Sequence, residues 1–361
     1  MKILDLAAFL FLYVATVRGN FRTIQNGILN IGEHVFEALD YGAEALNDRY
    51  IIGPNGIPIR IDTEELLFPT LGETQKNLPN TVFFYLYTRN NPTNSQRLNV
   101  GDENTLRNSN FNVSKNTLIY AHGWMANYTS AAGLRNACFT AILKNCDCNV
   151  ILLDWGAIAG KPYVWSSDRA GIISQYVAQM IDFLHAEGMD VSRLTIVGHS
   201  LGAHIAGLSS YYAKNKANFI VGLDPAQPNF LRAGAGIRLS SGDGNYVQVL
   251  HTNAGAAGFN MSLGDIDFWA NNGQTQNGCD SVNVFGIINC SHGRAVDYYM
   301  ESLNSRVEFI GRECDNYNDF TRGNCANNPT AVMGGVTPQT NLKGNFYFTT
   351  NMSPPYARGA E

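Results

Sequence analysis

One short stretch near the middle of the chain constrains its fold more than any other feature. Residues 194–197 are apolar, Gly198-His-Ser200-Leu-Gly202 follows them directly, and a helical pattern then runs from 201 to about 213. A Gly-x-Ser-x-Gly sequence between a strand and a helix is typical of a turn too sharp for side chains at its flanks. The turn holds Ser200 in a strained backbone with its hydroxyl exposed at the carboxyl end of a strand.

Five further apolar segments extend this unit into a sheet. With residues 194–197, the predicted strands are 82–87, 117–121, 149–153, 219–223 and 246–250. A long helical stretch lies between about 167 and 187, with apolar residues on one stripe. Short, non-alternating strands separated by helices predict an α/β fold with a mostly parallel central sheet and helices on both faces. Active residues gather at the carboxyl ends of strands in such sheets.

Composition excludes several classes of protein. The chain has 361 residues, of which 45% are hydrophobic and 11% aromatic, and this excludes disorder. The formal charge is −5 and no basic block is present, so we expect no nucleic-acid partner. No apolar run reaches the roughly 18 residues that cross a bilayer, so no transmembrane segment is predicted.

Residues 1–19 have the pattern of a secretory signal peptide. Lys2 precedes an apolar run, and Val17 and Gly19 stand at the −3 and −1 positions of a cleavage site. We therefore expect a secreted, extracellular protein; the alternative is a buried N-terminal helix. Residues 20–75 are predicted to be an N-terminal extension and 76–361 the main domain. An amphipathic helix at 28–46 is predicted as a strap on the domain, because its polar face is acidic rather than basic as in a membrane-touching helix.

Secretion would make the seven cysteines candidates for disulfides. Cys279 with Cys290, and Cys314 with Cys325, would each close a short loop. Cys138 would pair with Cys148 or Cys146, and the odd number leaves one cysteine free or paired between chains. No cysteine spacing suggests zinc. The Asn-x-Ser/Thr sequons that fit the same compartment are at Asn112, Asn127, Asn260, Asn289 and Asn351.

The serine needs a base and an orienting acid, because its hydroxyl is a poor nucleophile at neutral pH. In folds with this turn the chain order is serine, acid, histidine. Asp224 ends the strand after Ser200 and is the predicted acid, whereas Asp154 ends a strand before the serine. The later acidic residues that look like loop residues are Asp243, Asp265 and Asp267.

Three histidines follow the serine. His204 lies one turn into the helix and is predicted to point away from the turn or to pack beneath it. His251 ends a strand and is predicted to be buried and structural, although it is the second candidate for the base. His292 is the predicted base; we place it in a loop, 290–294, just before a helical run, where a bridge at Cys290 would fix it. Asp224 would orient its imidazole.

Attack by a serine of this kind creates an oxyanion, which needs two N–H donors. Leu201, which follows the serine, is one predicted donor. Trp124 is the other, because His122-Gly-Trp124 directly follows the predicted strand at 117–121. The alternative is that this tripeptide is only a turn.

The sequence at these positions resembles the pancreatic-type lipase family of α/β-hydrolases, in its neutral lipase and phospholipase A1 branch. The similar segments lie between about 81 and 356, at 118–124, 150–155, 197–204, 222–228, 251–252 and 290–295. The resemblance implies an α/β-hydrolase fold that needs no cofactor. The roles it implies are a triad of Ser200, Asp224 and His292, oxyanion donors at Trp124 and Leu201, and bridges Cys279–Cys290 and Cys314–Cys325.

Three departures from the family pattern carry further expectations. The lid, closed by the disulfide before the histidine, would be only 280–289, and reduced lids resemble phospholipases A1 or galactolipases. Its apolar residues would either meet lipid or pack on the pocket. No C-terminal β-sandwich domain is expected, so no colipase is expected as a partner. Arg238 and Asp243 of the family's calcium loop remain, but Ala235 and Ser240 replace acidic ligands, so no metal is predicted.

These observations predict a secreted serine carboxylic-ester hydrolase that cleaves fatty-acyl esters of lipids at an interface. It would be a triacylglycerol lipase or a phospholipase A1, with a Ser-Asp-His triad and no cofactor. The alternative is a non-catalytic lipid-binding or storage protein on the same fold. Yolk proteins of the family are of that kind and have lost triad residues, whereas this chain retains all three.

Overall fold

The computed structural model describes residues 50–52, 58–60, 68–128, 143–280, 284–339 and 341–359. The chain divides into two compact units, Met1–Thr74 and Gln75–Glu361. In the first unit, β1 (Tyr50–Ile52) and β2 (Pro58–Arg60) pair antiparallel. The predicted signal peptide at 1–19 and the predicted helix at 28–46 lie outside the described residues.

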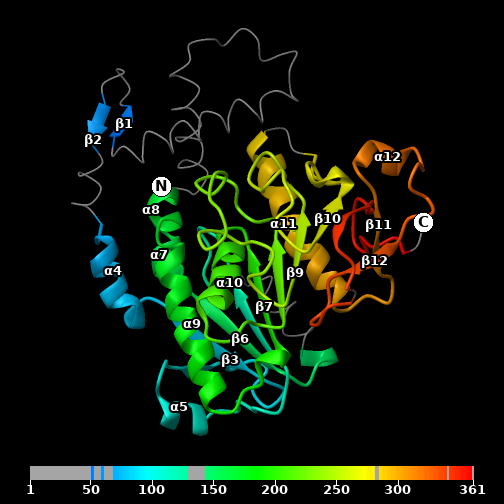
Figure 1. Ribbon diagram of the computed structural model, residues 1–361. Helices are drawn as coiled ribbons and strands as arrows, with labels where there is room; N and C mark the ends of the chain where they lie inside the picture. Colours follow the sequence, from blue (N-terminus) through cyan, green and yellow to red (C-terminus); the bar gives the residue numbers. More distant parts are fainter. Residues whose placement is uncertain are drawn as a thin grey trace. The chain divides into compact units, whose positions relative to one another are not determined.

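The described part of the second unit contains an 11-stranded sheet in the order β12-β11-β13-β10-β9-β8-β7-β5-β6-β3-β4 (Figure 1). The run from β13 to β6 is parallel, and antiparallel strands complete both edges. The strands are β3 (Phe83–Tyr87), β4 (Gln96–Leu98), β5 (Thr117–Ala121), β6 (Asn149–Asp154), β7 (Leu194–His199), β8 (Phe219–Leu223), β9 (Tyr246–His251), β10 (Ile266–Ala270), β11 (Phe309–Glu313), β12 (Thr330–Met333) and β13 (Gly344–Phe348).

Burial explains why the central strands read as unbroken apolar runs. Every residue of β5, β8 and β9 is buried, as expected for parallel strands covered on both faces. The six predicted strands coincide with β3 and β5 to β9 within two residues at each end. The predicted fold class is therefore confirmed.

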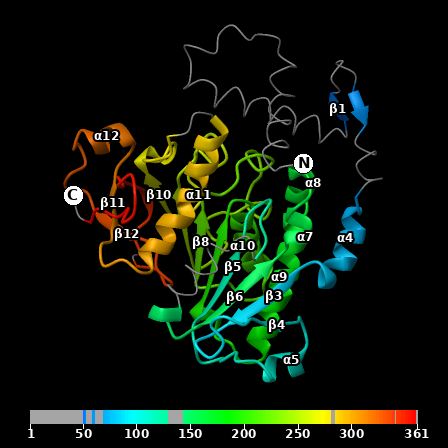
Figure 2. The ribbon, with the colours of Figure 1, turned by 180° about the vertical axis from the view of Figure 1, so that it is seen from behind.

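The long helices lie on opposite faces of this sheet. α9 (Ala170–Ala186) and α10 (Leu201–Tyr212) pack together on the face seen in Figure 1, and α11 (Val284–Ser302) crosses the other face, seen in Figure 2. The apolar stripe predicted on α9 is buried. The shorter helices are α4 (Leu71–Asn77), α5 (Glu103–Arg107), α7 (Gly156–Ala159), α8 (Tyr163–Ser167) and α12 (Tyr317–Thr321), with 3-10 turns at Leu78–Asn80, Val191–Arg193 and Asn271–Gly273.

The loop predicted at 290–294 is wrong, because these residues lie inside α11. Serine and glycine have low helix propensity, so the Cys-Ser-His-Gly-Arg sequence carries little local signal for a helix. Burial overrides the propensity. The side chains of Ser291, Ala295, Tyr298 and Tyr299 are fully buried at helical spacing, so one face of the helix is anchored in the core.

Two disulfides join described residues. Cys279–Cys290 has a Cα–Cα distance of 5.5 Å, and Cys314–Cys325 has one of 5.7 Å, as the resemblance implied. Cys146 and Cys148 form no disulfide with another described cysteine, and Cys138 lies outside the described residues. Within the described ranges, no helix is both long and apolar enough to span a bilayer.

Candidate active site

Ser200 sits on a strained turn between β7 and α10. Its backbone has φ +58° and ψ −124°, a region that few non-glycine residues occupy. A Cβ on Gly198 would collide with the carbonyl of Gly202, and a Cβ on Gly202 would collide with the carbonyl of Ala121. Both glycines are therefore required by close backbone approach, and the turn places Ser200 at the carboxyl end of β7.

Asp224 follows β8 directly and is fully buried. Its Oδ1 accepts hydrogen bonds from the main-chain N–H groups of Thr252, at 2.8 Å, and Asn253, at 2.9 Å. These two main-chain donors fix the position of the carboxylate. Gly258 leaves room for it, because a Cβ there would collide with the carboxylate of Asp224.

His292 lies on α11 against Asp224. Its Nδ1 is 2.6 Å from Asp224 Oδ2, so Nδ1–H donates to the carboxylate and Nε2 is left for a second partner. The side chain is 16% exposed, which leaves one edge open to a substrate. The structure thus brings together the predicted acid and the predicted base, which are far apart in the sequence.

His199 links the histidine to the serine turn. It precedes Ser200, its ring centroid lies 4.5 Å from that of His292, and its Nε2 is 3.1 Å from the main-chain oxygen of His292. Burial, and then the nearby His292, lower the pKa of His199 to about 3. A neutral His199 can donate this hydrogen bond from Nε2–H without placing a second positive charge beside His292.

The two predicted oxyanion donors lie on the segments that flank this turn. Leu201 is the first residue of α10, and Trp124 lies in the turn after β5. Among the described residues, neither main-chain N–H group donates to a protein acceptor. Two side-chain hydrogen bonds stabilise the turn after β5. Trp124 Nε1 donates to Lys161 O at 2.7 Å, and Trp155 Nε1 donates to His122 O at 2.9 Å.

The other two histidine candidates have both ring nitrogens engaged. His204 is fully buried, with Nε2 2.7 Å from Ala226 O and Nδ1 accepting from the N–H of Leu239. His251 is also fully buried, with Nδ1 3.0 Å from Phe259 O and Nε2 2.7 Å from Asp267 Oδ1. Neither ring has a free nitrogen for Ser200.

The interpretation of Asp267 as a loop residue is wrong. It lies in β10, is 1% exposed, and accepts hydrogen bonds from Leu263 N and Gly264 N as well as contacting His251. Asp267 interrupts the apolar run of β10, and an unpaired aspartate is disfavoured in a buried strand, so the sequence pattern did not predict this strand. Its partner lies on the neighbouring strand, β9, which only the sheet register reveals.

Arg238 and Asp243, the two residues that remain of the family's calcium loop, make hydrogen bonds within the protein. Arg238 donates to the carbonyls of Ala233, at 2.7 Å, and Leu239, at 2.8 Å. Asp243 is buried and accepts from the N–H of Ser240, and this burial raises its pKa to about 6. Within the described ranges, no three His, Cys, Asp or Glu side chains gather as a metal site.

Sequence reasoning did not find His199 or the two N–H donors to Asp224. His199 occupies the variable position of Gly-x-Ser-x-Gly, where the motif itself specifies no residue. The donors of Thr252 and Asn253 are main-chain groups, so their side chains carry no signal of the contact. Their place directly after strand β9 is the only sequence feature that points to them.

A mostly parallel sheet, a serine on a strained strand-to-helix turn, and an Asp-His pair beside it define the molecule as an α/β-hydrolase. A family model described as Lipase matches residues 50–356. The chain belongs to the lipase family.

Curated relatives agree with this assignment. Phospholipase A1 member A of Rattus norvegicus is 32% identical over 76% of this chain and 63% of its own length. Pancreatic triacylglycerol lipase of Oryctolagus cuniculus is 31% identical over 88% of this chain and 73% of its own length. The chain thus spans slightly under two thirds of the first relative. Among solved structures, a phospholipase/carboxylesterase from Dyadobacter fermentans matches 39% of this chain and 68% of that chain, with 14% identity and a TM-score of 0.30, too low to support a further conclusion.

Proposed function

We propose that this protein hydrolyses fatty-acyl esters of lipids, with Ser200 as nucleophile, His292 as base and Asp224 as the orienting acid. One observation carries the proposal. The imidazole of His292 contacts a buried carboxylate at 2.6 Å, and its ring centroid lies 4.5 Å from that of His199, which directly precedes Ser200 on the strained turn. Family membership supports the same chemistry, because the relatives are named as lipases and phospholipases A1.

In the first half of the reaction, His292 Nε2 takes the proton of the Ser200 hydroxyl as its oxygen attacks the ester carbonyl. Asp224 stabilises the imidazolium that forms. The main-chain N–H groups of Trp124 and Leu201 donate to the oxyanion, and in comparable sites one such donor lowers the barrier by about 2.7–4 kcal/mol. The N-terminal end of α10 adds a favourable dipole.

The tetrahedral intermediate then collapses. The C–O bond to the leaving alcohol breaks, and the imidazolium of His292 protonates that alcohol, which leaves an acyl-enzyme on Ser200. A water molecule deprotonated by His292 attacks the acyl-enzyme in the second half. The fatty acid leaves and Ser200 recovers its proton, so the cycle needs no cofactor.

The substrate we propose is a triacylglycerol or a phospholipid at an interface. The segment 280–289 between Cys279 and Cys290 is short, and this favours a phospholipase A1, since less lid is available to cover the pocket. We also propose that the protein is secreted. The predicted signal peptide at 1–19 supports this, as do the two disulfides, which persist in oxidising compartments.

The test is fatty-acid release by the purified protein from triolein and from phosphatidylcholine, measured side by side. Ser200→Ala should abolish release from both lipids while the protein stays folded. Ser209→Ala is the matched control, because Ser209 is buried on the same helix and, among the described residues, its hydroxyl bonds only the carbonyl of Ile205. Release mainly from phosphatidylcholine would support the phospholipase A1 assignment, and release mainly from triolein would support a neutral lipase. Folded protein that releases fatty acid from neither would favour a lipid-binding or storage role and overturn the proposal.

A further inference from the structure

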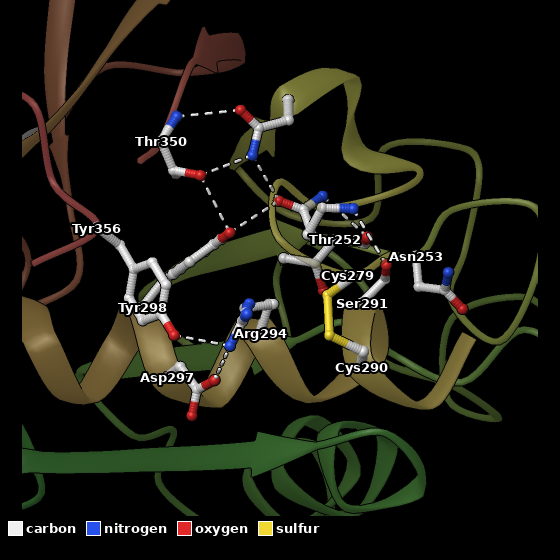
Figure 3. Close-up of a disulfide and its surroundings, with 12 residues drawn as sticks. Thr252, Asn253, Cys279, Cys290, Ser291, Arg294, Asp297, Tyr298, Thr350 and Tyr356 are labelled. Atoms are coloured by element: carbon white, nitrogen blue, oxygen red, sulfur yellow. Dashed lines mark hydrogen bonds and ion pairs between the residues drawn. A yellow bond between two sulfur atoms is a disulfide. The ribbon is translucent and has the colours of Figure 1, made fainter. Parts of the chain in front are cut away.

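The buried side chain of Gln276 is hydrogen-bonded both to the segment after β9, which binds Asp224, and to α11, which carries His292. Gln276 follows β10 and is 2% exposed. All the hydrogen-bonding positions of its side chain are used, since the Nε2 group makes two bonds as donor and Oε1 makes two as acceptor. Figure 3 shows this region, with Thr252, Asn253 and Ser291 near the Cys279–Cys290 disulfide and Tyr298 of α11 beside Tyr356.

The donor half of Gln276 holds the peptide group that binds the acid. Nε2 donates to Thr252 O at 2.9 Å and to Ala270 O at 2.8 Å. The carbonyl of Thr252 and the N–H of Asn253 belong to one planar peptide group. That N–H is one of the two donors to Asp224 Oδ1. The bond from Gln276 therefore fixes the orientation of a donor to the carboxylate, and it also polarises that donor through the peptide.

The acceptor half ties the same side chain to the helix of the base. Oε1 accepts from Tyr298 OH at 3.2 Å and from Asn271 Nδ2 at 2.8 Å. The main-chain N–H of Gln276 donates to Ser291 Oγ at 3.0 Å, directly before His292. The Cys279–Cys290 disulfide lies between the same segments (Figure 3). One residue thus joins the clamp on Asp224 to two points on α11.

We propose that Gln276 is a positioning residue, which sets the geometry between Asp224 and His292 without touching substrate. This inference rests on the proposed roles of those two residues as acid and base. Removal of the Nε2 donors would let the peptide between Thr252 and Asn253 rotate, which weakens the hold on the carboxylate. The imidazole would then lose its fixed orientation, and misplacement of a reacting group by about 1 Å can reduce the rate about 10²-fold.

The experiment compares Gln276→Met with wild type on a soluble short-chain ester. We expect kcat to fall about 10²-fold with KM unchanged within about twofold, because the residue aligns the catalytic groups and does not bind substrate. Gln248→Met is the matched control. Gln248 is also buried, lies on β9 beside β10, accepts from Gly334 N, and has no hydrogen bond to Asp224 or α11 among the described residues. This control should keep the wild-type kcat.

A proton NMR spectrum gives a second readout that needs no turnover. The His292–Asp224 bond at 2.6 Å should give a far-downfield proton signal that disappears in His292→Asn. The His251–Asp267 pair at 2.7 Å provides an internal reference. In Gln276→Met the His292 signal should shift or broaden while the His251 signal stays in place. If Gln276→Met does not fold, Gln276→Glu takes its place. Glutamate keeps the shape of the side chain but lacks the N–H donors, so it should change kcat and the His292 signal in the same direction.

The outcomes separate this inference from the proposed function. A folded Gln276 variant with wild-type kcat and an unmoved His292 signal would overturn the positioning role while leaving the hydrolase proposal intact. A wild-type protein without esterase activity would overturn the hydrolase proposal. In that case a displaced signal in the Gln276 variants would still support the positioning of the Asp-His pair.

Discussion

The carboxylate of Asp224 accepts from two main-chain N–H groups through Oδ1 and contacts the imidazole of His292 through Oδ2. These three contacts leave the carboxylate one orientation, and that orientation fixes the ring of His292. At the scale of single residues, the geometry of the candidate site therefore depends on the position of the Asp224 carboxylate. Two predictions follow from this dependence.

Asp224→Asn should reduce kcat about 10⁴-fold, because an amide does not stabilise the imidazolium and holds the ring in the wrong tautomer. Steady-state kinetics on a soluble ester measure this. Asp267→Asn is the matched control, since it alters another buried His-Asp pair, which has no side-chain hydrogen bond to Asp224 among the described residues. The control should lower the stability but keep the kcat of the folded fraction. Equal losses of kcat in both variants would contradict the assigned acid.

Gly258→Ala should reduce kcat about 10²-fold, because its Cβ would collide with the carboxylate of Asp224 and displace it. Gly234→Ala should have no effect, since nothing lies within 4 Å of a Cβ there. The comparison uses the same substitution in two loop glycines, each assayed for kcat and for thermal unfolding. An unaltered kcat in Gly258→Ala would mean that the acid tolerates displacement.

The serine, acid and base could be selected from the sequence because chain order and strand ends limit the candidates. Ser200 and Asp224 each follow an apolar run that predicts a strand, and few histidines come later in the chain. The contact of His199 with His292 could not be selected in this way. It depends on where α11 crosses the sheet, and no local sequence pattern records that crossing.

At the scale of elements, α11 and β10 both required the structure for their interpretation. The helix contains a serine and a glycine with low propensity, and the strand contains Asp267, so each conflicts with its local pattern. Both conflicts are resolved by long-range contacts, namely the burial of Tyr298 and Tyr299 and the pairing of Asp267 with His251. Tertiary packing outweighs local preference at both places.

The two disulfides allow a matched comparison of elements, because both join cysteines 11 residues apart. Replacing either pair with serine should lower the free energy of unfolding by about 3 kcal/mol, from the entropy gained by the unfolded chain. Only the Cys279/Cys290 double variant should also lower kcat, because that bridge joins α11 two residues before His292. Urea unfolding and kinetics on both double variants test this. An equal effect on kcat would show that the first bridge has no special role at the site.

At the scale of the whole molecule, stability depends on buried ionisable groups outside the site. Burial lowers the pKa of His204 to about 4 and raises the pKa of Asp243 to about 6. Between about pH 6.5 and 4 the unfolded chain binds a proton on His204 that the native state does not, so the native state loses stability as pH falls. Asp243 acts in the opposite sense, because the native state binds its proton near pH 6 and the unfolded chain only near 3.8.

Asp243→Asn should therefore make the protein more sensitive to acid. The free energy of unfolding of wild type relative to this variant should increase as pH falls from about 6 to 4, by about 1.4 kcal/mol per pH unit. Urea unfolding of both proteins across this range measures the difference. A difference that stays constant with pH would mean that Asp243 titrates alike in the native and unfolded states.

The architecture of the whole molecule was predictable because the central strands are buried on both faces. Their sequences are continuous apolar runs, which few other structures would produce. The edge strand β12 and its neighbour β11 were not predicted, since both mix buried and partly exposed positions and β11 includes Arg312 and Glu313. Among the described strands β12 pairs with β11 alone, and a strand that pairs on one side only has a less constrained sequence.

The most direct test of the central claim is covalent labelling of the nucleophile. The full chain is treated with diethyl p-nitrophenyl phosphate, which phosphorylates activated serines, and the adduct is located by peptide mass spectrometry. We expect one adduct, on the peptide that contains Ser200, with none in Ser200→Ala and strongly slowed labelling in His292→Asn. Folded protein that forms no adduct, or forms it at another serine, would contradict the assignment.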